Sequence, residues 1–81
     1  MADYRALLLQ QVRGPKPAPH PKHLVADGDD DAVNKALAMV GPEEKEHGVI
    51  LKAVLRLSDG VVIWEDGQRV QKPASELAYA I

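Results

Sequence analysis

Hydrophobic and polar positions in the second half of the chain predict a β-hairpin. Two runs rich in β-branched and aliphatic residues, 49–57 and 61–64, are separated by Asp59-Gly60. This dipeptide tolerates the positive φ angles of a tight two-residue turn. A second turn signal, Asp66-Gly67, follows. Residues 68–72 are therefore expected to return as a further strand.

The turn sets which side chains share a face of the hairpin. With Asp59-Gly60 as the turn, Leu57 lies opposite Val62 and Leu55 lies opposite Trp64. One face is then entirely apolar and is predicted to form the core: Val49, Leu51, Ala53, Leu55, Leu57, Val62 and Trp64. The other face mixes charged and aliphatic side chains and is predicted to meet water or a partner: Ile50, Lys52, Val54, Arg56, Ile63 and Glu65.

The first part of the chain predicts a strand followed by a loop. Residues 4–12 contain three consecutive leucines, so a strand buried on much of both faces competes with a short helix, and we favour the strand. Four of the six prolines then fall within residues 15–21. Because each proline lacks an N–H and restricts the residue before it, residues 14–22 are expected to form an exposed, flexible loop. Residues 23–26 are expected to return as a short edge strand.

A helix is predicted in the middle of the chain. Three aspartates, residues 29–31, are expected to open it, since carboxylates there cap free N–H groups and oppose the positive end of the helix dipole. Gly41-Pro42 is expected to end it, and residues 42–46 to form an acidic connector. The pattern does not decide between a helical turn and an edge strand for residues 73–81. Apolar residues recur at the spacing of one helical face: Val33, Ala36, Leu37 and Val40.

Together these elements predict an α+β fold, an antiparallel sheet of four or five strands with one α-helix packed on one face. The length of 81 residues suits a single domain, residues 1–81. The chain has no cysteine for a disulfide or a thiolate metal site, and no run of about 18 apolar residues that would span a bilayer. We therefore expect a soluble cytoplasmic protein.

Charge is segregated along the chain, although the net charge is only −2. Residues 1–26 carry +3, residues 27–46 carry −5, and the remainder is balanced. Lys52, Arg56 and Arg69 are expected to line the outer face of the sheet, where they suit contact with phosphate. Conversely, the acidic segment suits a basic partner, or imitates the phosphates of a nucleic acid.

The residue types that catalysis needs are scarce. There is no threonine or cysteine, and nothing in the sequence holds a base beside either serine, Ser58 or Ser75. His20 and His23 have zinc-ligand spacing, but they lie in the proline-rich segment with no rigid element to fix their geometry, so we interpret them as solvated side chains. His47 is expected to pack or hydrogen-bond locally. We therefore expect no enzymatic activity, no cofactor and no metal.

The hairpin resembles a known family. His47-Gly48-Val49, the turn at Asp59-Gly60 and the segment Glu65-Asp66-Gly67-Gln68-Arg69 are similar to small phage-encoded anti-CRISPR proteins that inhibit type I surveillance complexes, in particular type I-F. The resemblance implies a non-catalytic inhibitor that docks on the subunits holding the guide RNA and blocks target DNA. It also implies contacts from basic residues, which by position are Lys35 and Arg69.

These arguments together name four partner-binding residues: Lys35, Lys52, Arg56 and Arg69. The expected partner is a type I surveillance complex (Cascade) in the cytoplasm of a bacterial host, with nucleic acid as a secondary contact and no membrane. Two other functions stay open. One is a small nucleic-acid-binding regulator, and the other is an adaptor that self-associates through the exposed edge of its sheet. The sequence is compatible with a monomer or a dimer.

Overall fold

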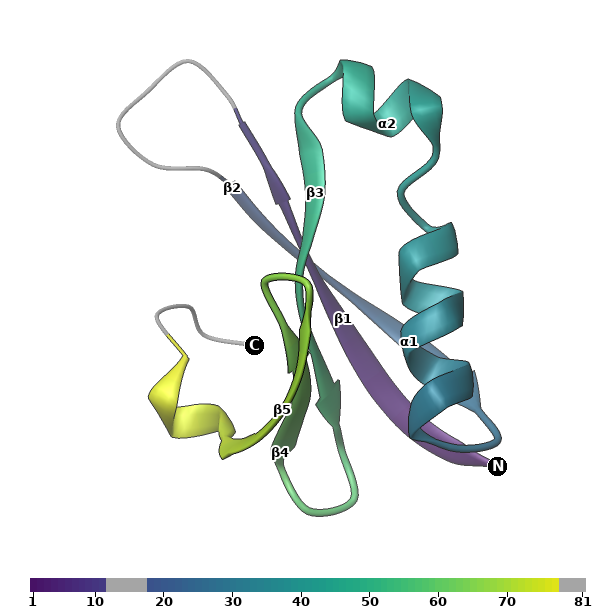
Figure 1. The fold of residues 1–81 in the computed structure, drawn as a ribbon, viewed down its shortest axis with the longest axis vertical. Coiled ribbons are helices and arrows are strands. Elements are labelled where there is room, and N and C mark those ends of the chain that lie inside the picture. The colour runs from purple at the N-terminus through teal and green to yellow at the C-terminus, as the bar shows by residue number, and fades with distance from the viewer. Residues whose placement is uncertain (12–17, 78–81) are drawn as a thin grey trace.

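The computed structural model describes residues 1–11 and 18–77 and shows an α+β fold (Figure 1). The sheet has five antiparallel strands in the order β2-β1-β3-β4-β5. The fold class expected from the sequence is confirmed. The elements in chain order are β1 (Ala2–Gln10), β2 (Ala18–Ala26), α1 (Asp29–Ala38), α2 (Pro42–Glu46), β3 (Val49–Arg56), β4 (Val61–Glu65), β5 (Gln68–Pro73) and the 3-10 turn η1 (Ala74–Glu76).

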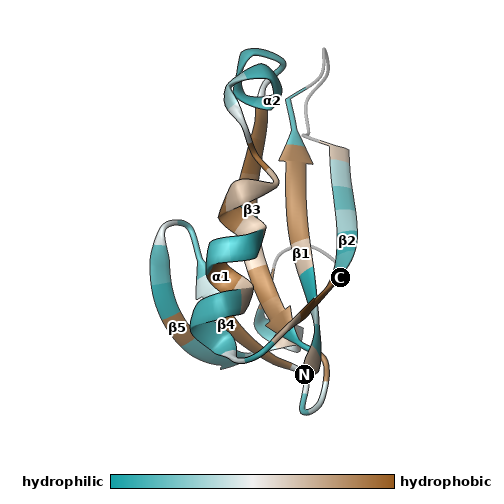
Figure 2. Cartoon of the chain, turned by 90° about the vertical axis from the view of Figure 1, so that its right-hand side faces the viewer, coloured by the Kyte–Doolittle hydropathy of each residue, from teal (hydrophilic) through white to brown (hydrophobic). Residues whose placement is uncertain are grey.

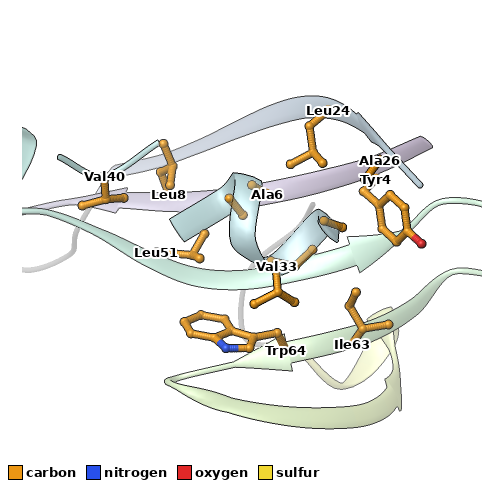
Figure 3. Close-up of a cluster of buried hydrophobic side chains, with 13 residues drawn as sticks. Tyr4, Ala6, Leu8, Leu24, Ala26, Val33, Val40, Leu51, Ile63 and Trp64 are labelled. Carbon is orange, nitrogen blue, oxygen red and sulfur yellow. The ribbon is translucent and has the colours of Figure 1, made fainter. Parts of the chain in front are cut away.

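The main core lies between α1 and one face of the sheet. Figure 3 shows Leu51, Ile63 and Trp64 of the sheet around Val33 of the helix. Small residues on α1, such as Ala36, are fully buried and let the helix approach the strands closely. The buried members of this cluster are Tyr4, Ala6, Leu8, Leu24, Ala26, Ala32, Val33, Ala36, Val40, Leu51, Val54, Ile63 and Trp64.

The opposite face of the sheet is also apolar. Its buried cluster consists of Leu7, Leu9, Ala53, Leu55 and Val62. Partly buried side chains from the loop after β3, from β5 and from the segment after β5 pack against it: Leu57, Val70, Ala74 and Leu77. The expectation that the sheet has one apolar face and one open face is therefore wrong, whereas the expected burial of the first strand on both faces is confirmed.

A β-bulge between β3 and β4 explains part of this difference. Leu55 pairs with Val62 and Val54 pairs with Trp64, so Ile63 is an extra residue of β4. An extra residue reverses the alternation of side chains beyond it. Trp64 consequently faces the helix while Val62 faces the other core. The predicted pairing of Leu55 with Trp64 is wrong for this reason.

A second bulge has the same effect between β1 and β3. Leu8 pairs with Leu51 and Leu7 pairs with Ala53, which leaves Lys52 as the extra residue. Leu51 therefore belongs to the main core and Ala53 to the second core. Strict alternation places both residues on one face, so the sequence prediction could not separate them.

The two predicted turns have different outcomes. Arg56 pairs with Val61, so residues 57–60 form a four-residue loop in which only Gly60 has a positive φ, 70°. A two-residue type I′ turn requires positive φ at both central residues, and the turn predicted at residues 59 and 60 is therefore wrong. At the second turn Asp66 and Gly67 both have positive φ, 52° and 87°, and β5 returns as predicted.

Strand β2 is longer than expected. It begins at Ala18, so the predicted loop over residues 14–22 is wrong for residues 18–22, while residues 14–17 lie outside the described part of the chain. The carbonyl oxygen of Val25 points away from β1, because it accepts a hydrogen bond of 2.9 Å from Lys35 Nζ. Backbone groups alternate in direction along a strand, so the backbone nitrogens of Pro19 and Pro21 also point away from β1. No ladder N–H is needed there, and proline is therefore tolerated.

The helices differ from the prediction in three respects. No side-chain hydrogen bond caps α1, although three aspartates occupy its first turn. Leu37, predicted to face the core, is 46% exposed. Residues 42–46 form a second helix rather than a connector: Pro42 begins α2 and Glu43 lies in its first turn.

Figure 2 shows how hydropathy follows this architecture. Hydrophobic residues concentrate along the central strands β1 and β3, and hydrophilic residues dominate α2, β5 and much of β2.

After β5, residues 74–76 form the 3-10 turn, which agrees with one of the two structures left open for residues 73–81. Residues 78–81 lie outside the described part. Among the described residues, no helix is long and apolar enough to cross a membrane.

Candidate protein-binding surface

Arg56 is held on the helix side of the sheet by two carboxylates. Its Nη1 donates to Asp29 Oδ2 at 2.8 Å, and its Nε and Nη2 donate to the two oxygens of Asp59 at 3.0 and 2.7 Å. The hydroxyl of the buried Tyr4 donates to Asp29 Oδ1 at 2.7 Å. These bonds join the first turn of α1 to β1 and to the β3–β4 loop.

The pKa values of this network favour the paired state. The hydrogen bonds from Arg56 lower the pKa of Asp59 below its usual value, and they raise the pKa of Arg56 above its own. Burial, supported by the hydrogen bond to Asp29, raises the pKa of Tyr4. Arg56 therefore stays charged and paired, because releasing it would leave carboxylates near Tyr4 without a counterion.

Arg69 reaches the same end of α1. Its guanidinium forms an ion pair with Asp30 and lies 4.0 Å from Asp29 Oδ2, and its Nε donates to the carbonyl oxygen of Ile63 at 3.3 Å. The aspartates that open the helix thus bind arginines of the sheet. The acidic middle of the sequence and the basic residues of its last part partly neutralise each other in the fold.

Lys52 also pairs within the molecule. Its Nζ donates to Asp66 Oδ2 at 2.6 Å and lies 3.9 Å from Glu65 Oε2, while the other oxygen of Glu65 pairs with Lys72. Its side chain is only 17% exposed. The bulge that makes Lys52 an extra residue of β3 therefore turns it toward the β4–β5 hairpin.

Lys35 is the last of the four expected contact residues. Its Nζ lies 3.3 Å from Asp31 Oδ2 and donates to the carbonyl oxygen of Val25. Asp31 in turn accepts a hydrogen bond from the backbone N–H of Asp27, which is the main reason why its pKa is lowered, and Lys35 adds to the effect. Lys35 thus connects α1 to the outer edge of β2.

The structure does not bring the four cations together as an outward-facing basic surface. Arg56 and Arg69 lie at the start of α1, Lys52 lies beside the β4–β5 turn, and Lys35 lies against β2. Each has a carboxylate partner. The prediction that Lys52 and Arg56 face away from the molecule is wrong, because both are paired and largely covered.

Helix α2 carries three acidic residues that are outside this ion-pair network. Glu43, Glu44 and Glu46 are exposed, and with the exposed Lys45 they give the helix a formal charge of −2. No ion pair involves these three glutamates among the described residues. His47, which caps the helix, bonds through Nδ1 to the carbonyl oxygen of Glu43 at 2.8 Å, so its expected local hydrogen bond is confirmed.

An apolar groove opens beside α2. It has a volume of about 330 Å³ and is lined by Leu37, Val40, Lys45, Val49, Ile50, Leu51 and Trp64. Leu37 and Ile50 are 46% and 47% exposed, and because both line the groove they give it apolar area that a partner can cover. Of the α2 residues, Lys45 lines the groove, and the three exposed glutamates lie on the same short helix beside it. The groove and α2 together form the surface best suited to a protein partner, and we call it the α2 groove.

Sequence reasoning missed the α2 groove for two reasons. The proline at the first position and the glutamates after it are signals for a helix start, and they were interpreted as a connector. Ile50 was expected on the open face of a two-stranded hairpin. The exposed position of Ile50 follows from the unequal lengths of β3 and β4, which turn signals alone do not fix.

The histidines show no metal-site geometry. His23 Nε2 lies 2.9 Å from Asp3 Oδ1, which leaves the pair on the exposed surface between β2 and β1. Within residues 1–11 and 18–77 no three His, Asp or Glu side chains are placed to hold a metal ion.

Comparisons with known proteins do not place the chain in a family. No protein-family model, no curated protein and no solved structure matched it.

Proposed function

We propose that this protein is a non-catalytic inhibitor that binds a type I CRISPR surveillance complex and keeps target DNA out of its channel. The observation that carries the proposal is the acidic helix α2, exposed beside an open apolar groove. The sequence resemblance described above names this class of complex. The proposed site of action is the cytoplasm of a bacterial host.

The chemistry of the partner favours an acidic contact surface. A guide-bearing complex holds nucleic-acid backbones with lysine and arginine side chains that line a channel. Glu43, Glu44 and Glu46 offer carboxylates to such cations, and the apolar groove supplies area that can be buried beside them. A compact domain of this size can provide the roughly 800 Å² per partner that a specific interface needs.

The contact residues of this proposal differ from those expected from the sequence. Lys35, Lys52, Arg56 and Arg69 each bind a carboxylate of the same chain, and breaking the largely covered pairs of Lys52 and Arg56 on docking would cost free energy. The same pairing argues against a nucleic-acid-binding regulator, because phosphate contacts need cations that are available to replace counterions. The outward-facing prolines of β2 argue against self-association through that edge.

The test is a titration of purified type I surveillance complexes, one subtype at a time, with measurement of target-DNA binding. We expect stoichiometric loss of DNA binding for at least one subtype, weakened by added salt because charged groups meet at the interface. Unchanged DNA affinity for every subtype would remove the proposal.

A further inference from the structure

Strand β3 extends beyond its neighbour on one side. Apart from the bulged Lys52, its residues pair with β1 from Val49 to Arg56, but β4 pairs only with Ala53 to Arg56. Figure 1 shows the upper half of β3 continuing past the β4–β5 turn toward α2. Asp66 N–H still bonds to the carbonyl oxygen of Lys52, and this bond is where the pairing ends. Residues 49–51 therefore form a short free edge within the sheet.

The direction of the backbone groups at this edge follows from the surrounding ladder. Gln11 N–H bonds to the carbonyl oxygen of Gly48, and Leu57 N–H bonds to that of Asp3, so the odd residues of β1 direct their groups toward β3. Leu9 pairs with Ile50, which must therefore bond to β1. The N–H and C=O groups of Val49 and Leu51 then point away from β1, toward the side of β3 where β4 does not pair.

The shape of the α2 groove agrees with this geometry. Val49, Ile50 and Leu51 all line it, although successive side chains of a strand point to opposite faces. A cavity that runs along the edge of a strand contacts consecutive residues in this way. Leu37 and Trp64 close the helix side of the groove, and among the described residues no loop or side chain hydrogen-bonds to the outward backbone groups of Val49 and Leu51.

We propose that this edge is a strand-addition site for an extended segment of a partner protein that alternates basic and apolar residues. The segment pairs its backbone with Val49 and Leu51, inserts an apolar side chain between Leu37 and Trp64, and places a lysine or arginine against the glutamates of α2. The charge of α2 selects a basic segment over an acidic one. This inference rests on the proposed binding function and specifies the part of the partner that α2 and the groove hold.

A tryptophan in the α2 groove can report on peptide binding. Trp64 is its single tryptophan and lines the groove, so its fluorescence reports directly on a bound segment. The probe is the synthetic peptide acetyl-Lys-Val-Lys-Val-Lys-Val-Lys-amide, and the control peptide has proline in place of each valine, which cannot pair as a strand. Amide hydrogen exchange of the 81-residue chain is followed by NMR with and without peptide.

In the free protein, the amides of Val49 and Leu51 are expected to exchange faster than that of Ile50. The valine peptide is expected to change Trp64 emission and to slow exchange at Val49 and Leu51 by about tenfold or more, and the proline peptide to do neither. Three results would overturn the inference. The amides of Val49 and Leu51 could already be protected in the free protein, or the peptide could protect another edge of the sheet instead. The third is an unchanged Trp64 emission up to about 1 mM peptide.

Two variants separate this site from a general effect. Leu37→Gln with Ile50→Thr changes two half-exposed side chains of the groove and should weaken peptide binding at least fivefold, while Val25→Thr, an exposed apolar residue on β2, should not. Equal affinities for the two variants would contradict the assignment. Light scattering supplies a further test: self-association that Ile50→Thr abolishes would assign the edge to a second copy of the chain.

The failure of this inference can be distinguished from failure of the proposed function. Inhibition of a surveillance complex without protection of the Val49 and Leu51 amides would keep the function and overturn the strand-addition site. Peptide binding with full protection, but no effect on any complex, would support the site and remove the proposed function.

Discussion

Arg56 on β3 donates a hydrogen bond of 2.8 Å to Asp29 in the first turn of α1. The bond joins residues 27 positions apart and fastens the helix to the sheet. Arg69 approaches the same aspartate from β5 and pairs with Asp30. The charges that look segregated in the sequence therefore pair within the fold, while the three glutamates of α2 stay outside these pairs.

The first prediction concerns Asp29. Replacing it by asparagine, Asp29→Asn, removes the charged acceptor of both Tyr4 and Arg56, and we expect a loss of about 1–2 kcal/mol in the free energy of unfolding. Asp30→Asn is the control, because the Asp30 side chain is 88% exposed and its pair with Arg69 lies at the surface. Urea unfolding measures both, and equal stabilities of the two variants would show that Asp29 does not fasten the helix.

The second prediction concerns acid stability. The pKa of Asp59 is lowered, chiefly by its hydrogen bonds from Arg56, so its ionised form is favoured in the folded protein. This contribution is fully present above the unfolded pKa, about 3.9, and is lost as the pH falls through the lower folded value. Asp59→Asn should therefore be less stable than the original chain at pH 6 and lose less stability on further acidification. Thermal unfolding between about pH 6 and pH 2 tests this, and parallel pH profiles would contradict it.

The third prediction uses two glycines with opposite backbone conformations. Gly67 has a φ of 87° in the β4–β5 turn, whereas Gly28 is extended with a φ of −179° and has open space around it. Gly67→Ala is expected to cost about 1 kcal/mol, and Gly28→Ala to change stability by less than about 0.5 kcal/mol. Guanidinium unfolding of both variants measures the difference, and an equal effect would argue against the type I′ turn.

The fourth prediction tests the second core. Leu7 is fully buried on the face of the sheet away from α1, and Leu7→Ala is expected to destabilise the protein by about 2–5 kcal/mol. Leu37→Ala removes the same atoms from a half-exposed site and should cost less than about 1 kcal/mol. If both substitutions were tolerated equally, the second face would not be a core.

The sequence predicts where the helix and strands lie, but not which face of the sheet each side chain occupies. The Gly41-Pro42 pair and the three aspartates place the helix close to its observed position, and the Asp66-Gly67 turn does the same for the last hairpin. The bulges at Lys52 and Ile63 carry no local signature, because each is fixed by pairing with residues far away in the chain. Each bulge reverses the alternation, so the predicted division into core and open face failed.

The candidate site was less predictable than the fold. The four cations were predicted to bind a partner, but their ion pairs join positions up to 39 residues apart, which no local pattern encodes. The prolines of residues 18–22 were interpreted as a loop signal, yet Pro19 and Pro21 alternate so that both missing N–H groups fall on the outer edge of β2. The α2 groove depends on the relative lengths of β3 and β4 and appears only once the sheet is assembled.

The most direct test of the account compares two charge variants as inhibitors of the same surveillance complex. Glu43→Gln, Glu44→Gln and Glu46→Gln together remove the acidic surface of α2, and Arg69→Gln removes the most exposed arginine of the sheet. The Glu76→Gln variant, changed on the 3-10 turn, controls for the loss of an exposed acid. We predict that the triple variant loses at least tenfold in inhibition of target-DNA binding, whereas the other two inhibit normally. Loss of inhibition by Arg69→Gln with full activity of the triple variant would contradict the account.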